Sequence, residues 1–157
     1  MYKYNHSFNT KIITSGEHIN LHDCRATRIS LKNKTLFFTF ADGFWIEQND
    51  IHENKKYYTG ESQMEFPLLY SEDTAITIYI FTEDNKNTIR TEHTLNDLMT
   101  QINTDLCSLE FLYSYISSQT FRFDCWLWYD KEPYHKECEL IISAENVIYH
   151  WNEVYEE

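Results

Sequence analysis

Phe121-Arg-Phe-Asp-Cys-Trp-Leu-Trp-Tyr129 is a stretch in which apolar residues alternate with a second, mixed set. Successive side chains of a strand point to opposite faces of a sheet, so this pattern predicts a strand with two unlike faces. One face carries apolar and aromatic residues only. The other face combines Arg122 and Asp124 with Trp126 and Trp128. Large aromatics normally lie in the core, so this second face either packs beneath another element or binds something.

The following segment, from His135 to Ile142, fixes how this strand pairs. A hairpin across Asp130–Pro133 places Cys125 opposite Cys138 on the apolar face. On the other face it places Trp128 opposite His135 and Trp126 opposite Glu137. A slip of one residue would bury Glu137 without a partner, which is energetically costly.

The segment before the strand extends the same pattern. Applied across the turn at 117–120, the same reasoning predicts that Leu109 and three aromatic residues lie beside the tryptophans. We call the resulting surface the predicted platform, and its residues are Phe111, Tyr113, Tyr115, Trp126 and Trp128, edged by Arg122, Asp124, His135, Glu137 and Glu139.

Elsewhere the chain alternates in the manner of short strands. Asp42-Gly43 between Thr35–Ala41 and Phe44–Gln48 predicts a tight hairpin that pairs Phe40 with Trp45. Further expected strands are 11–14, 19–21, 27–31, 57–59, 63–69, 75–82 and 146–152, and 50–56 is expected to be a polar loop. The period changes to that of a helix at about 94–105, where Leu95, Leu98, Met99, Ile102 and Leu106 form an apolar stripe after the cap residue Thr94.

These patterns predict a mainly β fold in one domain spanning residues 1–157. Two antiparallel meanders would form a sandwich or a partly open barrel, with the amphipathic helix at the crossover between them. The length is sufficient for a hydrophobic core.

Composition excludes several classes of function. The formal net charge of -12 argues against a nucleic-acid binder, which needs cationic surface to neutralise phosphates. No apolar run is long enough for a membrane helix, and the first residues lack the apolar segment of a secretion signal, so we expect a cytoplasmic protein. The three glycines include no phosphate-binding loop, and no hydrolase or metalloprotease motif occurs, so we expect no cofactor.

Two other chemistries fit residues of this chain. His22, Cys24, His135 and Cys138 are zinc-type ligands, but His135 and Cys138 would point to opposite faces of one strand, so we expect no metal site. Cys125 opposite Cys138 could form a disulfide, although a cytoplasmic location favours thiols. Asp124, Glu137 or Glu139 could instead act with His135 as an acid–base group.

The segments Leu21-His-Asp-Cys24, Asp42-Gly-Phe-Trp45 and Trp126-Leu-Trp-Tyr-Asp-Lys-Glu-Pro-Tyr-His135 give the chain a resemblance to small uncharacterised β-rich bacterial proteins. The resemblance extends over much of the length. It implies a β-rich fold and does not point to any particular activity.

The leading functional hypothesis is a non-catalytic module that engages another protein through the predicted platform. The acidic charge suits a basic partner, as in small acidic immunity or antitoxin proteins, which are an analogy only. The first alternative is a small-ligand receptor that uses the same aromatics. The second is an enzyme that uses His135 with Asp124 or Glu137. The candidate binding residues are Phe111, Tyr113, Tyr115, Trp126, Trp128, His135 and Glu137.

Overall fold

The computed structural model describes residues 3–9, 17–49 and 54–157 and consists mainly of antiparallel β-sheet. The first sheet contains five strands, in the order β1 (His6–Asn9), β14 (Ile148–Trp151), β8 (Ser62–Pro67), β5 (Thr35–Phe40) and β4 (Arg28–Lys32). The second contains six, in the order β10 (Asn87–His93), β9 (Ile76–Asp84), β13 (His135–Ser143), β12 (Thr120–Tyr129), β11 (Cys107–Ser117) and β3 (Cys24–Ala26). The third contains four, in the order β15 (Val154–Glu156), β7 (Asn54–Thr59), β6 (Trp45–Asn49) and β2 (Glu17–Asn20).

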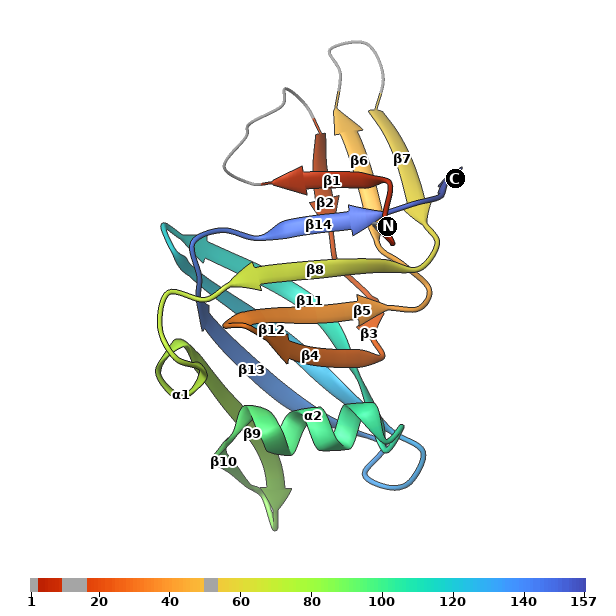
Figure 1. Cartoon of the computed structure of the whole chain (residues 1–157). Coiled ribbons are helices and arrows are strands. Elements are labelled where there is room, and N and C mark those ends of the chain that lie inside the picture. The colour runs from red at the N-terminus through yellow and green to blue at the C-terminus, as the bar shows by residue number, and fades with distance from the viewer. Residues whose placement is uncertain (1–2, 10–16, 50–53) are drawn as a thin grey trace.

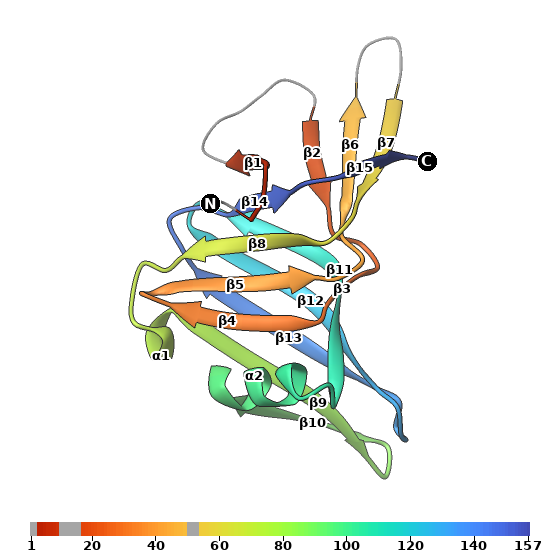
Figure 2. The ribbon, with the colours of Figure 1, turned by 45° about the vertical axis from the view of Figure 1, so that its right-hand side comes forward.

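The five-stranded and six-stranded sheets form the two layers of a sandwich. Strands β4, β5 and β8 cross in front of β11, β12 and β13 in both Figure 1 and Figure 2. The four-stranded sheet stands at the top of both views. Helix α2 (Leu95–Asn103) packs against β4, β9 and β11 at the lower end, and the four-residue helix α1 (Glu72–Ala75) precedes β9. The expectation of a mainly β sandwich is confirmed, and the described strands form no closed barrel.

Phenylalanines from both layers build the centre of the core. Phe111 lies 5.6 Å from Phe38, 5.6 Å from Phe40 and 5.2 Å from Phe123 between ring centroids. Phe66 adds contacts to Phe123 at 6.0 Å and to Phe121 at 5.3 Å. Most of these pairs meet edge to face, the arrangement that the aromatic quadrupole favours. The sheets are therefore joined through apolar side chains on their facing sides.

The predicted helix is present but ends earlier than its stripe. The Thr94 hydroxyl accepts a hydrogen bond from the Asp97 amide at 3.1 Å, and this cap begins α2. Leu95, Leu98 and Ile102 are buried as expected. Asp105 adopts a φ of 62°, which turns the chain out of the helix and leaves Leu106 exposed.

The predicted Asp-Gly hairpin is wrong. Strand β5 pairs with β4 and β8, whereas β6 pairs with β2 and β7 in a different sheet. The Gly43 amide donates a hydrogen bond to the Phe40 carbonyl at 3.1 Å, which makes Gly43 the last residue of the turn and not one of its two central residues. Gly43 has a positive φ of 81°, whereas Asp42 does not have the positive φ that the predicted hairpin requires. The turn lets Phe40 and Phe44 both enter the core, where their rings are 5.9 Å apart, and a flat hairpin would separate them.

Other expectations differ in detail. The expected strand at 11–14 lies outside the described residues, and the expected loop at 50–56 is partly strand β7. The sequence patterns did not reveal β1, β10, β15 or α1. The N-terminal strands do not form a simple meander, because β8 pairs with β5 and the C-terminal strand β14 lies between β8 and β1 in the five-stranded sheet. Neither helix of the described residues is long and apolar enough to cross a membrane.

Gly43→Ala tests the corner between the sheets. A Cβ at Gly43 would lie 2.1 Å from the Thr59 carbonyl oxygen, and the φ of 81° disfavours any side chain. We expect the free energy of unfolding to fall by at least about 2 kcal/mol. Gly60→Ala is the matched control, because its Cβ would meet only side-chain atoms, the nearest at 3.4 Å. Equal denaturation midpoints for the two variants would contradict this description of the corner.

Candidate functional site

A β-bulge in β11 decides which residues reach the outer side of the six-stranded sheet. Phe111 pairs with Cys125, whereas Tyr113 pairs with Asp124, so Leu112 is the extra residue. Before the bulge, Leu109 and Phe111 face the core, and both are 0% exposed. After it, Tyr113 and Tyr115 face outward. The prediction that Leu109 and Phe111 lie beside the tryptophans is therefore wrong, because the bulge reverses the alternation.

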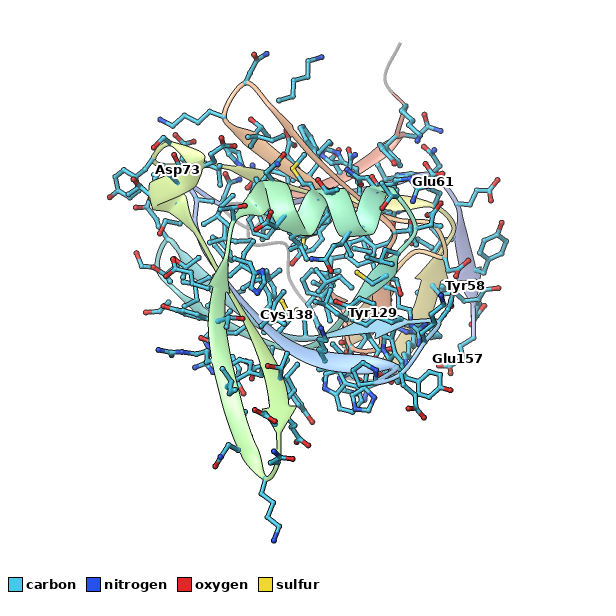
Figure 3. All side chains as sticks on the ribbon, turned by 90° about the horizontal axis from the view of Figure 1, so that it is seen from below. Tyr58, Glu61, Asp73, Tyr129, Cys138 and Glu157 are labelled. Carbon is cyan, nitrogen blue, oxygen red and sulfur yellow. The ribbon has the colours of Figure 1, made fainter. Side chains whose placement is uncertain are left out.

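The rest of the predicted platform lies on one surface, which we call the outer face. Strands β12 and β13 pair as expected, with Trp126 opposite Glu137, Trp128 opposite His135 and Cys125 opposite Cys138. In Figure 3, Cys138 and Tyr129 lie on the side of these strands that α2 covers. On the opposite side, that view shows the β9–β10 hairpin extending from the same sheet, and no separate described helix or strand lies across β12 and β13 there. Tyr113 and Tyr115 remain 58% and 52% exposed there.

Four side chains form a compact group on the outer face, which we call the aromatic cluster: Trp126, Trp128, His135 and Arg25. The His135 ring stacks on Trp126 with centroids 4.1 Å apart and planes at 12°. Trp128 lies 5.4 Å from Trp126, and the Arg25 guanidinium lies 4.8 Å from the Trp128 ring centroid. Both tryptophans are half-buried, so each still presents part of its ring to solvent. The cluster is held in place by these mutual contacts rather than by a covering element.

The indole N–H of Trp128 is a buried donor without a partner. It has no hydrogen-bond acceptor among the described residues. An unsatisfied buried donor costs about 1–3 kcal/mol, and such groups are rare in native structures. The cost is unusual for a residue whose only role is to fill a core.

Carboxylates surround the aromatic cluster, and arginines pair with most of them. Arg25 Nε lies 3.3 Å from Glu110 Oε2. Arg122 lies 3.3 Å from Asp124 Oδ1 and 3.5 Å from Glu139 Oε1. Glu137 is exposed and has no ion-pair partner among the described residues. Glu137 is therefore the acidic group beside Trp126 that remains able to pair with a positive charge from outside.

Three hollows flank the aromatic cluster. One of about 230 Å³ lies at the sheet edge between Arg25, Trp128 and Asp105. A second of about 330 Å³ lies between Trp126, Phe81 and Tyr113. The largest, of about 580 Å³, is lined by His135, Glu137, Phe81, Thr88 and Pro133. The two tryptophans thus form a ridge on the outer face, and hollows lie on both sides of this ridge.

The residues considered for a zinc site do not converge. Cys24 and Cys138 are buried, whereas His22 and His135 are exposed, and no group of metal-binding side chains occurs among the described residues. Burial raises the pKa of Cys24 to about 12, of Cys107 to about 11 and of Cys138 to about 12. It also raises the pKa of Cys125 well above its ordinary value. Buried protonated thiols are poor nucleophiles and poor metal ligands.

The acid–base arrangement gains no support from the geometry. The His135 ring is engaged by Trp126 and Trp128, and it makes no hydrogen bond to Asp124, Glu137 or Glu139. Those carboxylates that have partners are paired with arginines instead.

Sequence patterns missed Arg25, Phe81, Tyr79 and Arg90. One row of paired residues crosses the whole outer face in the order Arg90, Phe81, Glu137, Trp126, Glu110 and Arg25. The alternation of Thr77, Tyr79 and Phe81 with buried isoleucines indicated an outward set on β9. It could not indicate that β9 lies beside β13, and the three-residue strand β3 has no pattern of its own.

Truncation of neighbouring aromatics tests the bulge. Phe111→Ala removes a fully buried ring, and we expect a loss of about 3–5 kcal/mol in the free energy of unfolding. Tyr113→Ala removes an exposed ring, and we expect a loss below about 1 kcal/mol. Regular alternation without a bulge predicts similar losses at both positions, so equal values in urea denaturation would refute the register given above.

His135→Ala tests the stacking on Trp126. Loss of the ring exposes more of the indole, so we expect a red shift of tryptophan emission and stronger quenching by acrylamide. The unfolding free energy should change by no more than about 1 kcal/mol. His22→Ala is the control, because that ring contacts Tyr113 at 5.7 Å and no tryptophan. An unchanged emission spectrum in His135→Ala would contradict the stacked geometry.

Protein-family models, curated proteins and solved structures give no match to this chain. Any functional assignment therefore rests on the outer face itself. Its defining property is a pair of tryptophans ringed by charged side chains on a sheet surface that no described element covers.

Proposed function

We propose that this protein is a non-catalytic binding module that engages another protein through the outer face. The observation that carries the proposal is the half-buried pair Trp126 and Trp128 on a sheet surface that no described element covers. Tryptophan and arginine are the residues most enriched at the energetic centres of interfaces. The unpaired Trp128 N–H supports the same function, because a partner can supply the acceptor and so recover its cost.

The partner that fits this surface carries basic side chains. Glu137 is an unpaired carboxylate next to the Trp126 ring, so an incoming lysine or arginine gains an ion pair and a cation–π contact together. The net charge of -12 attracts a basic protein over longer distances, and this raises the association rate at low ionic strength. Acidic immunity and antitoxin proteins act in this way, and the analogy is one of charge and size. The proposal places the protein in the cytoplasm, with its four buried thiols reduced.

A small-ligand receptor is the second candidate. The hollow of about 580 Å³ beside His135 and Phe81 has the volume of a small-molecule site. Titration of small molecules would then change the emission of Trp126, whereas a protein interface predicts no such response.

Photo-crosslinking tests the proposal. Tyr134 is 52% exposed and adjacent to His135, so a photoreactive phenylalanine at this position replaces one aromatic ring with another. Irradiation in the cells that produce the protein should yield one discrete adduct with a second protein. Trp126→Ala and Glu137→Lys should each reduce this adduct at least tenfold.

Two controls accompany the crosslinking. Trp45→Ala removes a half-buried tryptophan of the four-stranded sheet, and Glu72→Lys reverses an exposed charge on α1, so both should preserve the adduct. Circular dichroism checks that each variant is folded. An adduct that survives both outer-face substitutions excludes this surface, and the absence of any protein adduct favours the small-ligand candidate.

A further inference from the structure

The second half of β11 is an unpaired sheet edge. Strand β3 pairs only with Leu109–Phe111. The Asp23 amide then donates to the Phe111 carbonyl at 2.9 Å, and His22 Nδ1 lies 2.8 Å from the Leu112 carbonyl oxygen. From Tyr113 to Ser117, no described strand pairs with this side of β11. The backbone groups that point away from β12 are free to pair with another strand.

This free edge is regular and uncharged. Its pairing with β12 is uninterrupted from Tyr113 opposite Asp124 to Ser117 opposite Thr120. Tyr113, Tyr115 and Ile116 are 58%, 52% and 57% exposed, and they belong to the most exposed large hydrophobic residues of the described chain. Tyr113 and Tyr115 lie on the outer face and Ile116 lies on the opposite face, so the edge is uncovered on both faces of the sheet.

The edge lacks the features by which proteins usually prevent strand addition. Native edges carry charged residues, prolines or bulges along their length. The segment from Phe111 to Phe121 contains no charged residue, no proline and no glycine. The bulge at Leu112 lies before the free part rather than within it. By contrast, the opposite edge strand of the same sheet, β10, carries Arg90 and Glu92, and β4 at the edge of the five-stranded sheet carries Arg28 and Lys32.

We propose that a second copy of this chain adds to this edge, with the two β11 strands antiparallel about a two-fold axis at Tyr115. This register places Tyr115 opposite Tyr115 of the second copy and Ser114 opposite Ile116. It begins beyond Leu112, so the contact between His22 and the Leu112 carbonyl is retained. The six-stranded sheet of one copy and that of the other then join into one continuous sheet.

Charge favours a second copy over a basic partner at this position. Two chains of net charge -12 repel one another over most of their surface, but they meet here without any charged residue facing another across the new pair. A basic strand would find no carboxylate on the edge itself. The opposed tyrosines form a favourable cross-strand aromatic pair. The Arg122 guanidinium, 5.2 Å from the Tyr115 ring centroid, already holds that ring on the outer face.

The arrangement has a consequence for the outer face. The two-fold axis of an antiparallel pair runs perpendicular to the sheet, so the outer faces of both copies point to the same side. Both aromatic clusters therefore face one direction in the dimer. A partner with two binding surfaces would be held more tightly than by either copy alone. The dimer itself does not depend on the function proposed above.

Sedimentation velocity of the full chain over a range of concentrations tests the dimer. We expect a monomer–dimer equilibrium in the wild type, with Ile116→Lys weakening association at least tenfold because each copy brings an unpaired charge to the uncharged edge. Ile89→Lys is the matched control, because Ile89 is 43% exposed on the opposite edge strand, and it should leave association unchanged. A wild type that remains monomeric at several hundred micromolar, or a dimer that Ile116→Lys does not weaken, overturns the proposal.

Disulfide capture tests the register. Residues directly opposite in an antiparallel pair have Cα atoms about 4.5–5.5 Å apart, a separation that a disulfide spans. Tyr115→Cys should therefore form a covalent dimer under mild oxidation, and the four native cysteines do not compete because they are buried. Ile89→Cys should form none. Equal crosslinking of both variants indicates random collision, and an adduct of Tyr115→Cys with a different protein indicates another occupant; either result overturns the proposal.

Discussion

The packing of Phe111 between the two layers of the sandwich is the contact on which the surfaces of this protein depend. Its ring meets Phe38 and Phe40 from the five-stranded sheet and Phe123 from its own sheet. Burying it while Tyr113 stays outside requires one extra residue in β11, and the bulge at Leu112 provides it. The same extra residue sends both tyrosines to the outer face. A core constraint thus determines which aromatics solvent or a partner can reach.

The two faces of β12 and β13 serve different purposes although they belong to the same strands. The inner face is apolar, and burial holds its thiols protonated, as at Cys138, whose pKa rises to about 12. The outer face retains tryptophans that are only half-buried, held by His135 and Arg25 instead of by a second layer. Stacking and cation–π contacts fix these rings in advance, so a partner would lose little side-chain entropy on binding them.

Sequence patterns predicted strand pairing correctly where the burial of apolar residues and the exposure of charged residues both favoured the same register. The register of β12 with β13 was predictable because a slip of one residue would bury Glu137. The bulge was not predictable from the sequence. Phe111, Leu112 and Tyr113 are all compatible with either face of the sheet, and no residue type in this segment marks the position of the extra residue. The hairpin at Asp42-Gly43 was predicted wrongly because the burial of Phe40 and Phe44 together outweighs the local preference of the Asp-Gly pair for a hairpin. Strand β10 was missed because nearly all its residues are exposed and show no apolar alternation.

For the candidate site, the tryptophans, His135 and Glu137 were found, whereas Arg25 depends on a long-range pairing of β3 with β11 that no local pattern encodes.

The distribution of charge links the outer face to the edge of β11. Asp and Glu outnumber Lys and Arg by 25 to 13, yet the segment from Phe111 to Phe121 has no charge of either sign. A strongly acidic surface keeps copies of a chain apart everywhere except where it is interrupted, so the uncharged edge is the place where two copies approach at least cost. The acidic outer face attracts the opposite kind of surface, because Glu137 stands unpaired beside Trp126. Self-association at the edge and recognition of a basic partner on the face are therefore compatible: each uses the residues that the other leaves free.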